Sequence, residues 1–194
     1  MSAVAEARTM KITKIKEHIG AEVTGIDLRE PIDEETRRRL YDAAVDNVAL
    51  VIRGQKFDAA QYQAAAELFG ELMEDQNRRY LVDGLPLVSV LSNRHKDSQG
   101  NPAKVGKNAT WHTDHTNQER PPKFTMLYPV ALPEKGGGTV FPDVSLEVAP
   151  KRGNGVFFSY DRPHAVTRTL HGGAPVLAGE KWIATKWLRE RRFE

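Results

Sequence analysis

The sequence contains no cysteine among its 194 residues. This absence excludes disulfide frameworks, thiolate zinc sites, iron–sulfur clusters and thiol nucleophiles. Any metal ion must therefore be held by His, Asp or Glu side chains. A chain without cysteine also fits a reducing compartment, so we expect a cytoplasmic protein.

The sequence also has little net charge and no long apolar run. Lys and Arg number 28 against 26 Asp and Glu, a formal net charge of +2, so we expect no nucleic-acid partner. No apolar stretch approaches the roughly 20 residues that span a bilayer, and the N-terminal residues lack the apolar segment of a secretory signal. We therefore expect no membrane partner. The sequence leaves homo-oligomerisation open.

The first half of the chain carries helix signals. We expect a flexible N-terminus over residues 1–10, followed by one domain over 11–194. Its helix-rich front covers residues 11–92: Asp33 is an N-cap candidate, and Asp58 with Gln61 forms a capping-box pattern before a second helix. The short apolar run 49–52 predicts a buried strand between the two helices.

The second half, residues 110–190, reads as a β core. Short apolar segments are separated by Gly- and Pro-rich turns, a pattern typical of a sandwich or barrel. The fold class is therefore α+β and mainly β. The strand candidates are residues 110–116, 124–131, 139–141, 146–149, 155–160, 169–171 with 175–177, and 181–188.

The chemistry is concentrated in the segment Trp111–Thr116, which contains the pattern His112-x-Asp114. On a strand, residues two apart project from the same face, about 7 Å apart at Cα. An imidazole and a carboxylate so placed can take two positions on one metal ion. A second histidine would complete the facial triad of a non-haem Fe(II) oxygenase, which leaves positions open for other ligands. The alternative is a surface strand with hydrogen-bonded polar side chains.

Residues from about 11 to 143 resemble the taurine dioxygenase/TfdA family of Fe(II)- and 2-oxoglutarate-dependent oxygenases. The resemblance implies a double-stranded β-helix core of the jelly-roll or cupin type, with helices from the N-terminal half packed on one side. It implies that His112 and Asp114 are iron ligands and that Thr139 lies near the 2-oxoglutarate carboxylate. The matching segments are IGAEVTGIDLREPID (19–33), ALVIRGQKFD (49–58), FGEL (69–72), VLSNR (90–94), WHTDHTNQERPPKFTMLY (111–128) and LPEKGGGTVF (132–141).

The tail, residues 136–190, instead resembles the end of a prolyl 4-hydroxylase-type oxygenase. There the last iron ligand lies in a Leu-His-x-Gly-x-Pro-Val segment, and a Lys ten positions later binds the distal carboxylate of 2-oxoglutarate. The matching residues here are His171 and Lys181. The chain thus resembles a composite of two families, of natural or constructed origin.

Taken together, the two resemblances imply a site for Fe(II), 2-oxoglutarate and O₂. Lys181 offers a compact positive charge to the dianionic co-substrate, and Thr139 and Tyr128 offer hydroxyl donors. Gly172-Gly173 and Ala178-Gly179 suggest a tight antiparallel pair between the strands that carry His171 and Lys181.

Several assignments have rivals in the sequence. His164 is an alternative third metal ligand, and Arg168 and Arg189 are alternatives to Lys181. We expect His115 to pack beside the site and Trp182 and Trp187 to fill space on opposite strand faces.

These features predict an oxidoreductase, a 2-oxoglutarate-dependent dioxygenase that hydroxylates a small organic acid or sulfonate. Asn93, Arg94 and the loop 95–108 are expected to border the substrate. A prolyl 4-hydroxylase-like hydroxylase of a peptidyl or free amino acid is the second reading. A catalytically inactive β-domain binding module and a hydrolytic zinc site are further alternatives.

Overall fold

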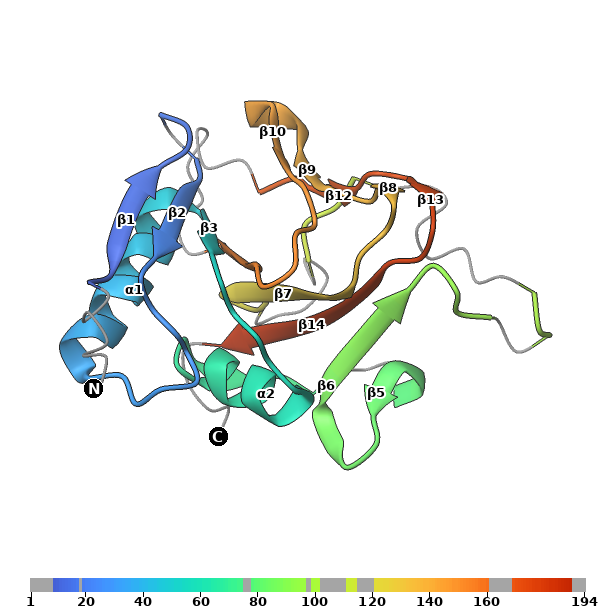
Figure 1. Ribbon diagram of the computed structural model, residues 1–194, viewed down its shortest axis with the longest axis horizontal. Helices are drawn as coiled ribbons and strands as arrows, with labels where there is room; N and C mark the ends of the chain where they lie inside the picture. Colours follow the sequence, from blue (N-terminus) through green and yellow to red (C-terminus); the bar gives the residue numbers. More distant parts are fainter. Residues whose placement is uncertain are drawn as a thin grey trace, which may run out of the picture.

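The computed structural model (Figure 1) describes residues 9–17, 19–74, 78–96, 99–101, 111–114, 121–160 and 169–189. Strands dominate, and both α-helices come from the first half of the chain. None of the helices in this part of the chain has the length and apolar character needed to cross a membrane.

The first half begins with β1 (Lys11–Lys14) and β2 (Ala21–Thr24), followed by α1 (Glu34–Asn47), β3 (Ala49–Ile52) and α2 (Ala59–Glu67). Asp33 caps α1 by accepting a hydrogen bond from the Thr36 N–H at 2.7 Å. Asp58 and Gln61 form a complete capping box at the start of α2. These caps satisfy backbone N–H groups that a helix start leaves unpaired, which is why both helices begin where the sequence predicts.

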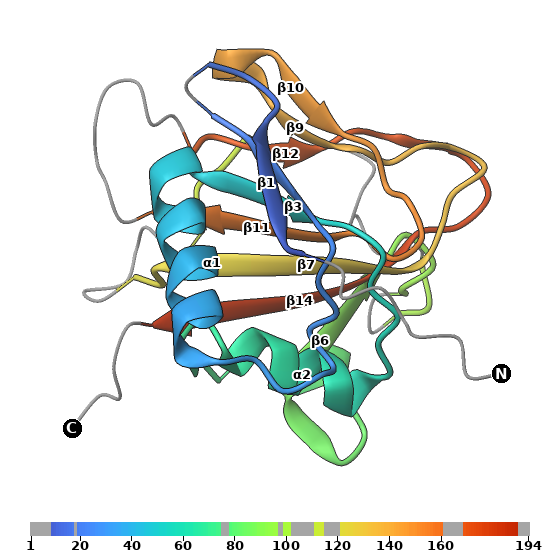
Figure 2. The same cartoon turned by 60° about the vertical axis from the view of Figure 1, so that its left-hand side comes forward.

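Nine strands form the main sheet, in the order β1-β2-β3-β11-β7-β14-β6-β5, with β4 paired to β14 beside this path. Figure 2 shows both helices lying across one face of this sheet. The remaining members are β4 (Glu71–Leu72), β5 (Leu81–Val82), β6 (Leu85–Ser92), β7 (Phe124–Ala131), β11 (Gly155–Ser159) and β14 (Trp182–Arg189), and a 3-10 turn (Arg78–Tyr80) precedes β5.

Two smaller sheets lie over the other face of the main sheet (Figure 1). One has the order β10-β9-β12 and the other pairs β13 with β8. Their strands are β8 (Lys135–Gly136), β9 (Thr139–Phe141), β10 (Leu146–Val148), β12 (Gly172–Gly173) and β13 (Val176–Ala178), and a 3-10 turn (Pro142–Val144) joins β9 to β10.

Strand alternation divides the core into two layers. In β11, Phe157 packs with the helices, whereas Val156 and Phe158 pack with the small sheets. β3 alternates in the same way, because successive side chains leave a strand on opposite faces. The layer between the main and small sheets is the interior of the β core, and it is also where the candidate site lies.

The structure departs from the expected strands at the tail. Gly172–Gly173 pairs with β9, and Val176–Ala178 pairs with β8. β14 pairs with β6 and β7 instead. The expected tight pair between the strands carrying His171 and Lys181 is therefore wrong: each of these strands finds its partner elsewhere in the β core.

Candidate metal centre and adjoining cavity

His112 and His171 are brought together by a short antiparallel bridge. The N–H of each residue donates to the carbonyl of the other at 3.0 Å, and the two ring centroids lie 4.5 Å apart. Asp114 follows two residues later, and its Oδ1 lies 3.3 Å from His112 Nε2 and 3.8 Å from His171 Nε2. The three potential ligand atoms all lie within 4.8 Å of one another.

Asp114 therefore lies near His112 and His171, as predicted, but it does not lie on a strand. Among residues 111–114 only His112 makes a bridge, and Asp114 lies in a turn. The expected strand over 110–116 is not seen in its described residues. A turn can still bring His112 and Asp114 together because it folds the carboxylate back toward the ring.

Asp114 is held firmly through its other oxygen. Its Oδ2 accepts three hydrogen bonds, from Thr125 Oγ1 at 2.7 Å, Tyr160 Oη at 2.9 Å and Trp187 Nε1 at 2.9 Å. Only 10% of the side chain is exposed. Oδ2 is thus engaged by the protein, and Oδ1 is turned toward the two imidazoles.

The electrostatics favour an ionised Asp114. Burial alone raises the pKa of this carboxyl, but neighbouring groups outweigh burial and hold the pKa well below its usual range. These influences are the hydrogen bond from His112, the electrostatic interaction with the His171 ring, and the hydrogen bonds from Thr125 and Trp187. Burial and the Asp114 charge together raise the pKa of Tyr160, which therefore stays a hydroxyl donor.

His171 is oriented in the same manner. Its Nδ1 lies 2.9 Å from the Thr169 carbonyl, which can only accept, so the Nδ1 proton points there and Nε2 keeps its lone pair. The ring packs against Phe141 and Phe158 at centroid distances of 5.8 and 4.5 Å. Burial lowers the pKa of His171, which favours the neutral imidazole that metals bind.

This donor set fits a single non-haem metal ion. Two imidazoles and one carboxylate make the facial arrangement typical of Fe(II) oxygenases. Ligand atoms sharing one ion at about 2.1 Å lie roughly 3 Å apart, close to the separations seen here. His171 and Asp114 also have the outer hydrogen-bond partners that fix metal ligands in place. The His112 side chain is 52% exposed, so the centre opens on that side.

A narrow cavity of about 10 Å³ lies in the interior of the β core. Lys181, Thr139 and Asn154 line it, together with apolar residues of β7 and β14. Burial lowers the pKa of Lys181. Thr139 pairs with Gly173, two residues beyond His171, so the cavity adjoins the candidate metal centre. The structure thus brings together Lys181 and Thr139 as the sequence predicts.

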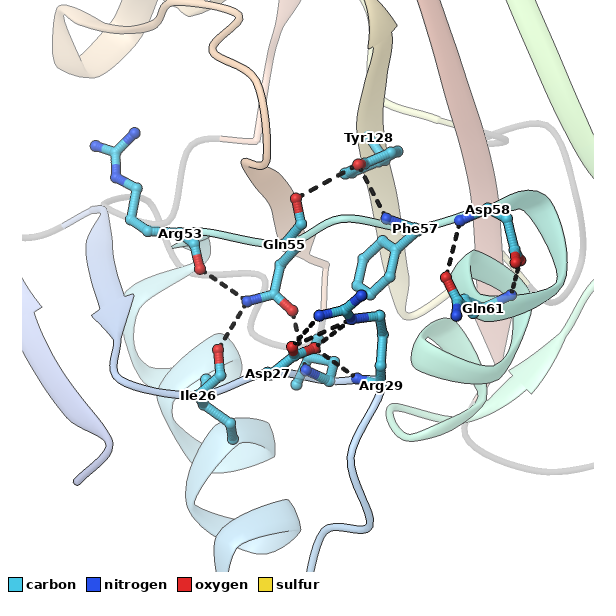
Figure 3. Close-up of polar contacts among 10 residues, drawn as sticks. Ile26, Asp27, Arg29, Arg53, Gln55, Phe57, Asp58, Gln61 and Tyr128 are labelled. Atoms are coloured by element: carbon cyan, nitrogen blue, oxygen red, sulfur yellow. Dashed lines mark hydrogen bonds and ion pairs between the residues drawn. The ribbon is translucent and has the colours of Figure 1, made fainter. Parts of the chain in front are cut away.

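Tyr128 does not join this group, and its predicted role is corrected. Successive residues of β7 face opposite sides, so Tyr128 shares the helix-facing side with Phe124 and Met126. Its hydroxyl accepts a hydrogen bond from the Phe57 N–H at 3.1 Å and contacts the Gln55 carbonyl at 3.5 Å (Figure 3).

Asn93 and Arg94 lie beside the Lys181 backbone. Asn93 Oδ1 accepts a hydrogen bond from the Lys181 N–H at 2.8 Å, and Nδ2 contacts the Gly179 carbonyl at 3.5 Å. Arg94 is exposed and pairs with Glu180 at 3.3 Å. In this structure Asn93 therefore positions the start of β14, and its role as a substrate ligand stays a prediction.

Of the rivals, His164, Arg168 and His115 lie outside the described residues. Arg189 lies opposite Glu71 in the pairing of β14 with β4. This end of β14 is about 26 Å along the strand from Lys181. Arg189 is therefore excluded as a replacement for Lys181.

Sequence reasoning missed the three residues that hold Asp114. Trp182 and Trp187 do lie on opposite faces of β14, as predicted, and Trp182 packs near His95. Trp187, however, donates to Asp114 instead of simply filling space. No sequence signal marked this contact, because Trp187 and Asp114 lie far apart in the chain.

Known proteins of two kinds match this chain. The family described as "Taurine catabolism dioxygenase TauD, TfdA family" matches residues 11–146. An alkylsulfatase of Acinetobacter baylyi is 31% identical over 133 residues, covering 68% of this chain and 39% of that protein. Prolyl 4-hydroxylase subunit alpha-1 of Rattus norvegicus is 29% identical over 162 residues, covering 72% of this chain and 28% of that protein.

The chain thus spans well under half the length of these two relatives. Among solved structures, a putative alpha-ketoglutarate-dependent taurine dioxygenase from Burkholderia xenovorans superposes with a TM-score of 0.71 at 18% identity, covering 93% of this chain and 89% of that one. This likeness confirms the predicted jelly-roll fold. Because the family match covers most of the chain, including His112 and Asp114, the chain belongs to the TauD/TfdA family.

Proposed function

We propose that this chain is an Fe(II)- and 2-oxoglutarate-dependent dioxygenase that hydroxylates a small organic acid or sulfonate-like substrate. One observation carries the proposal. One potential ligand atom from each of His112, Asp114 and His171 lies within 4.8 Å of the others, while the second carboxylate oxygen of Asp114 and the second ring nitrogen of His171 are engaged by the protein. This arrangement supports a facial triad.

In this proposal each residue has a defined task. His112, Asp114 and His171 would hold the iron. Lys181 would pair with the distal carboxylate of 2-oxoglutarate, and Thr139 would donate a hydroxyl hydrogen bond. When bound, Fe(II) with 2-oxoglutarate and O₂ supplies the oxidising chemistry that yields succinate, CO₂ and a hydroxylated product. The apolar walls of the cavity, among them Leu127 and Ile183, would exclude water around Lys181 and strengthen its ion pair.

Two findings support the substrate class. The family is described by taurine catabolism, and taurine is a small sulfonate. A relative that matches 68% of this chain is an alkylsulfatase, whose name indicates an anionic sulfate ester. Residues 102–110 and 115–120, beside the candidate ligands in sequence, lie outside the described residues, so the substrate class is proposed from these likenesses.

A peptidyl or free amino-acid substrate is the second candidate. The observation that favours it is the similarity to prolyl 4-hydroxylases in animals and in Arabidopsis thaliana. The half-exposed His112 leaves the metal centre accessible from solvent, which a peptide substrate requires. Product analysis with the two substrate classes separates these candidates.

The first experiment measures succinate formed from 2-oxoglutarate under air with added Fe(II). Many enzymes of this reaction class release some succinate without their prime substrate, so the assay assumes no substrate. His171→Ala and Lys181→Ala are compared with His18→Ala and Lys14→Ala. His18 is far from the proposed ligands in the sequence, and Lys14 is exposed on β1, so each control removes the same residue type outside the proposed site.

We expect succinate formation to be abolished in His171→Ala and strongly reduced in Lys181→Ala, with both controls near wild type. Loss in His164→Ala with retention in His171→Ala would overturn the ligand assignment. A wild-type chain that neither forms succinate nor binds Fe(II) would instead support an inactive binding module. Zinc-dependent hydrolysis without 2-oxoglutarate consumption would support a hydrolytic site.

A further inference from the structure

Asn154 is a buried polar residue with an unused donor. It ends the turn that leads into β11, and only 4% of the residue is exposed. Its backbone N–H donates to the Lys151 carbonyl at 3.1 Å. Within the described part of the chain, however, its side-chain Nδ2 has no hydrogen-bond partner. Buried donors are nearly always paired, and leaving one unpaired is costly.

The position of Asn154 indicates what the missing partner is. Asn154 lines the same narrow cavity as Lys181 and Thr139. No described carboxylate pairs with the Lys181 ammonium, and burial is the sole influence on its pKa. The cavity is thus lined by two lysines, an amide and a hydroxyl, with no acidic side chain among its lining residues. The second lysine, Lys151, is exposed, so Lys181 is the buried cation of the pair.

The remaining walls make this an environment for one small anion. Leu127 and Pro129 of β7 and Ile183 of β14 are apolar. In such surroundings a lysine needs a counter-ion, and a carboxylate needs donors for both of its oxygens. Lys181 and the Asn154 amide together offer donors to two oxygens of one carboxylate.

We propose that Asn154 is a co-substrate-binding residue, whose Nδ2 donates to the same distal carboxylate of 2-oxoglutarate that pairs with Lys181. This inference rests on the proposed function and adds to it a second donor that fixes the carboxylate. Because the cavity holds only about 10 Å³, roughly one water, the flexible Lys181 side chain shifts when the carboxylate enters.

The test measures ligand binding and stability, not turnover. Isothermal titration calorimetry with Mn(II) in place of Fe(II) gives the Kd of 2-oxoglutarate and of 2-oxobutyrate, a 2-oxo acid without the distal carboxylate. The variants are Asn154→Ala, Asn154→Asp and the control Asn47→Ala. Asn47 is 9% exposed, and its Nδ2 donates to the Ala43 carbonyl at 2.9 Å, so it is a buried asparagine whose donor is used.

We expect Asn154→Ala to weaken 2-oxoglutarate binding roughly tenfold or more, as loss of a hydrogen bond to a charged group does. Binding of 2-oxobutyrate stays unchanged. Asn154→Asp weakens 2-oxoglutarate further, because a second negative charge faces the carboxylate. The Tm of Asn154→Ala without ligand stays level or rises, since an unpaired buried donor is removed, whereas Asn47→Ala lowers the Tm and keeps wild-type affinity for 2-oxoglutarate.

Two results would overturn the inference while leaving the proposed function intact. One is an Asn154→Ala affinity for 2-oxoglutarate within about twofold of wild type. The other is a lower Tm together with equal weakening of both 2-oxo acids, which would mark Asn154 as a structural residue. A wild-type chain that binds 2-oxobutyrate as tightly as 2-oxoglutarate would overturn the proposed role of Lys181, and the inference with it.

Discussion

Replacing Trp187 by Phe removes one donor from Asp114 while keeping an aromatic ring on β14. The indole Nε1 lies 2.9 Å from Asp114 Oδ2, and the hydroxyls of Thr125 and Tyr160 donate to the same oxygen. The carboxylate therefore keeps two of its three donors in this variant. Its Oδ1, which faces His112 and His171, is then held less firmly.

The size of the effect follows from these contacts. A hydrogen bond to a charged group contributes about 1.5–3 kcal/mol, or roughly 10- to 150-fold in an equilibrium constant. Removing an outer partner of a metal ligand weakens metal binding by about 10- to 100-fold. Because two donors remain on Oδ2, we expect the lower part of this range, a loss of roughly 10- to 30-fold in metal affinity.

The assay is isothermal titration calorimetry, in which Mn(II) or Co(II) is added to the metal-free protein and the Kd of the metal is measured. Trp182→Phe is the matched control, because Trp182 is on the same strand but faces away from Asp114 and packs near His95 at a centroid distance of 5.9 Å. We expect this control to bind metal as the wild type does. A Trp187→Phe affinity within about twofold of wild type would refute the reasoning that Oδ2 must be fully engaged.

Three further predictions concern the scaffold of the site. Burial lowers the pKa of Lys181 in the folded protein below its ordinary value of 10.5. Between the folded and the unfolded pKa the unfolded chain binds more protons, so the free energy of unfolding rises with pH. Lys181→Met therefore raises the Tm of the metal-free protein at pH 7, by about 2–4 °C for each kcal/mol gained in the free energy of unfolding. Calorimetry that shows the same gain in Tm at pH 10 as at pH 7 would contradict this. Gly137→Ala costs roughly 2–4 kcal/mol in urea unfolding, since its φ is +75° and a Cβ would lie 3.2 Å from Lys181 Cδ. Gly84→Ala shares φ +75° with open space around it and costs only about 1–2 kcal/mol; equal costs would exclude a packing contribution at Gly137. Gln55→Leu removes an amide that accepts from the Leu28 N–H and donates to the carbonyls of Ile26 and Arg53 (Figure 3). Urea unfolding then shows a free energy of unfolding lower by about 2–4 kcal/mol. A decrease under about 1 kcal/mol would contradict the role assigned to these bonds.

Local signals predicted much of the fold. The strands at 124–131 and 139–141 have the predicted bounds, because Pro and Gly residues terminate each apolar run. The helix starts at Asp33 and Asp58 were predicted because capping depends on residues only three positions apart. Such features depend on neighbours in the sequence, so one sequence suffices to find them.

The contacts that complete the site were not predictable in this way. Thr125, Tyr160 and Trp187 reach one carboxylate oxygen from separate parts of the chain, and nothing local to any of them marks that meeting. Tyr128 was misplaced for a related reason. It lies three residues from Thr125, and an odd separation puts two side chains on opposite faces of a strand.

The candidate site has two halves, the metal centre around Asp114 and the cavity beside Lys181, and the same face of β14 and of β7 contributes to both. On β14, Trp187 donates to Asp114, and Ile183 lines the cavity. On β7, Thr125 donates to Asp114, and Leu127 lines the cavity. These residues are an even number of positions apart on each strand, so a one-residue slip of either strand would remove its contributions to both halves together.

This shared face explains how two family patterns can form one site. The family match ends at residue 146, yet His171 and Lys181 lie beyond it. β9 pairs with β10 on one side and with β12, directly after His171, on the other. β7, which lies within the match, pairs with both β11 and β14, which lie outside it. The register between these strands therefore brings His171 beside Asp114 and places Lys181 in the adjoining cavity. A composite chain needs that register, more than any single residue, for its two parts to form the proposed metal site.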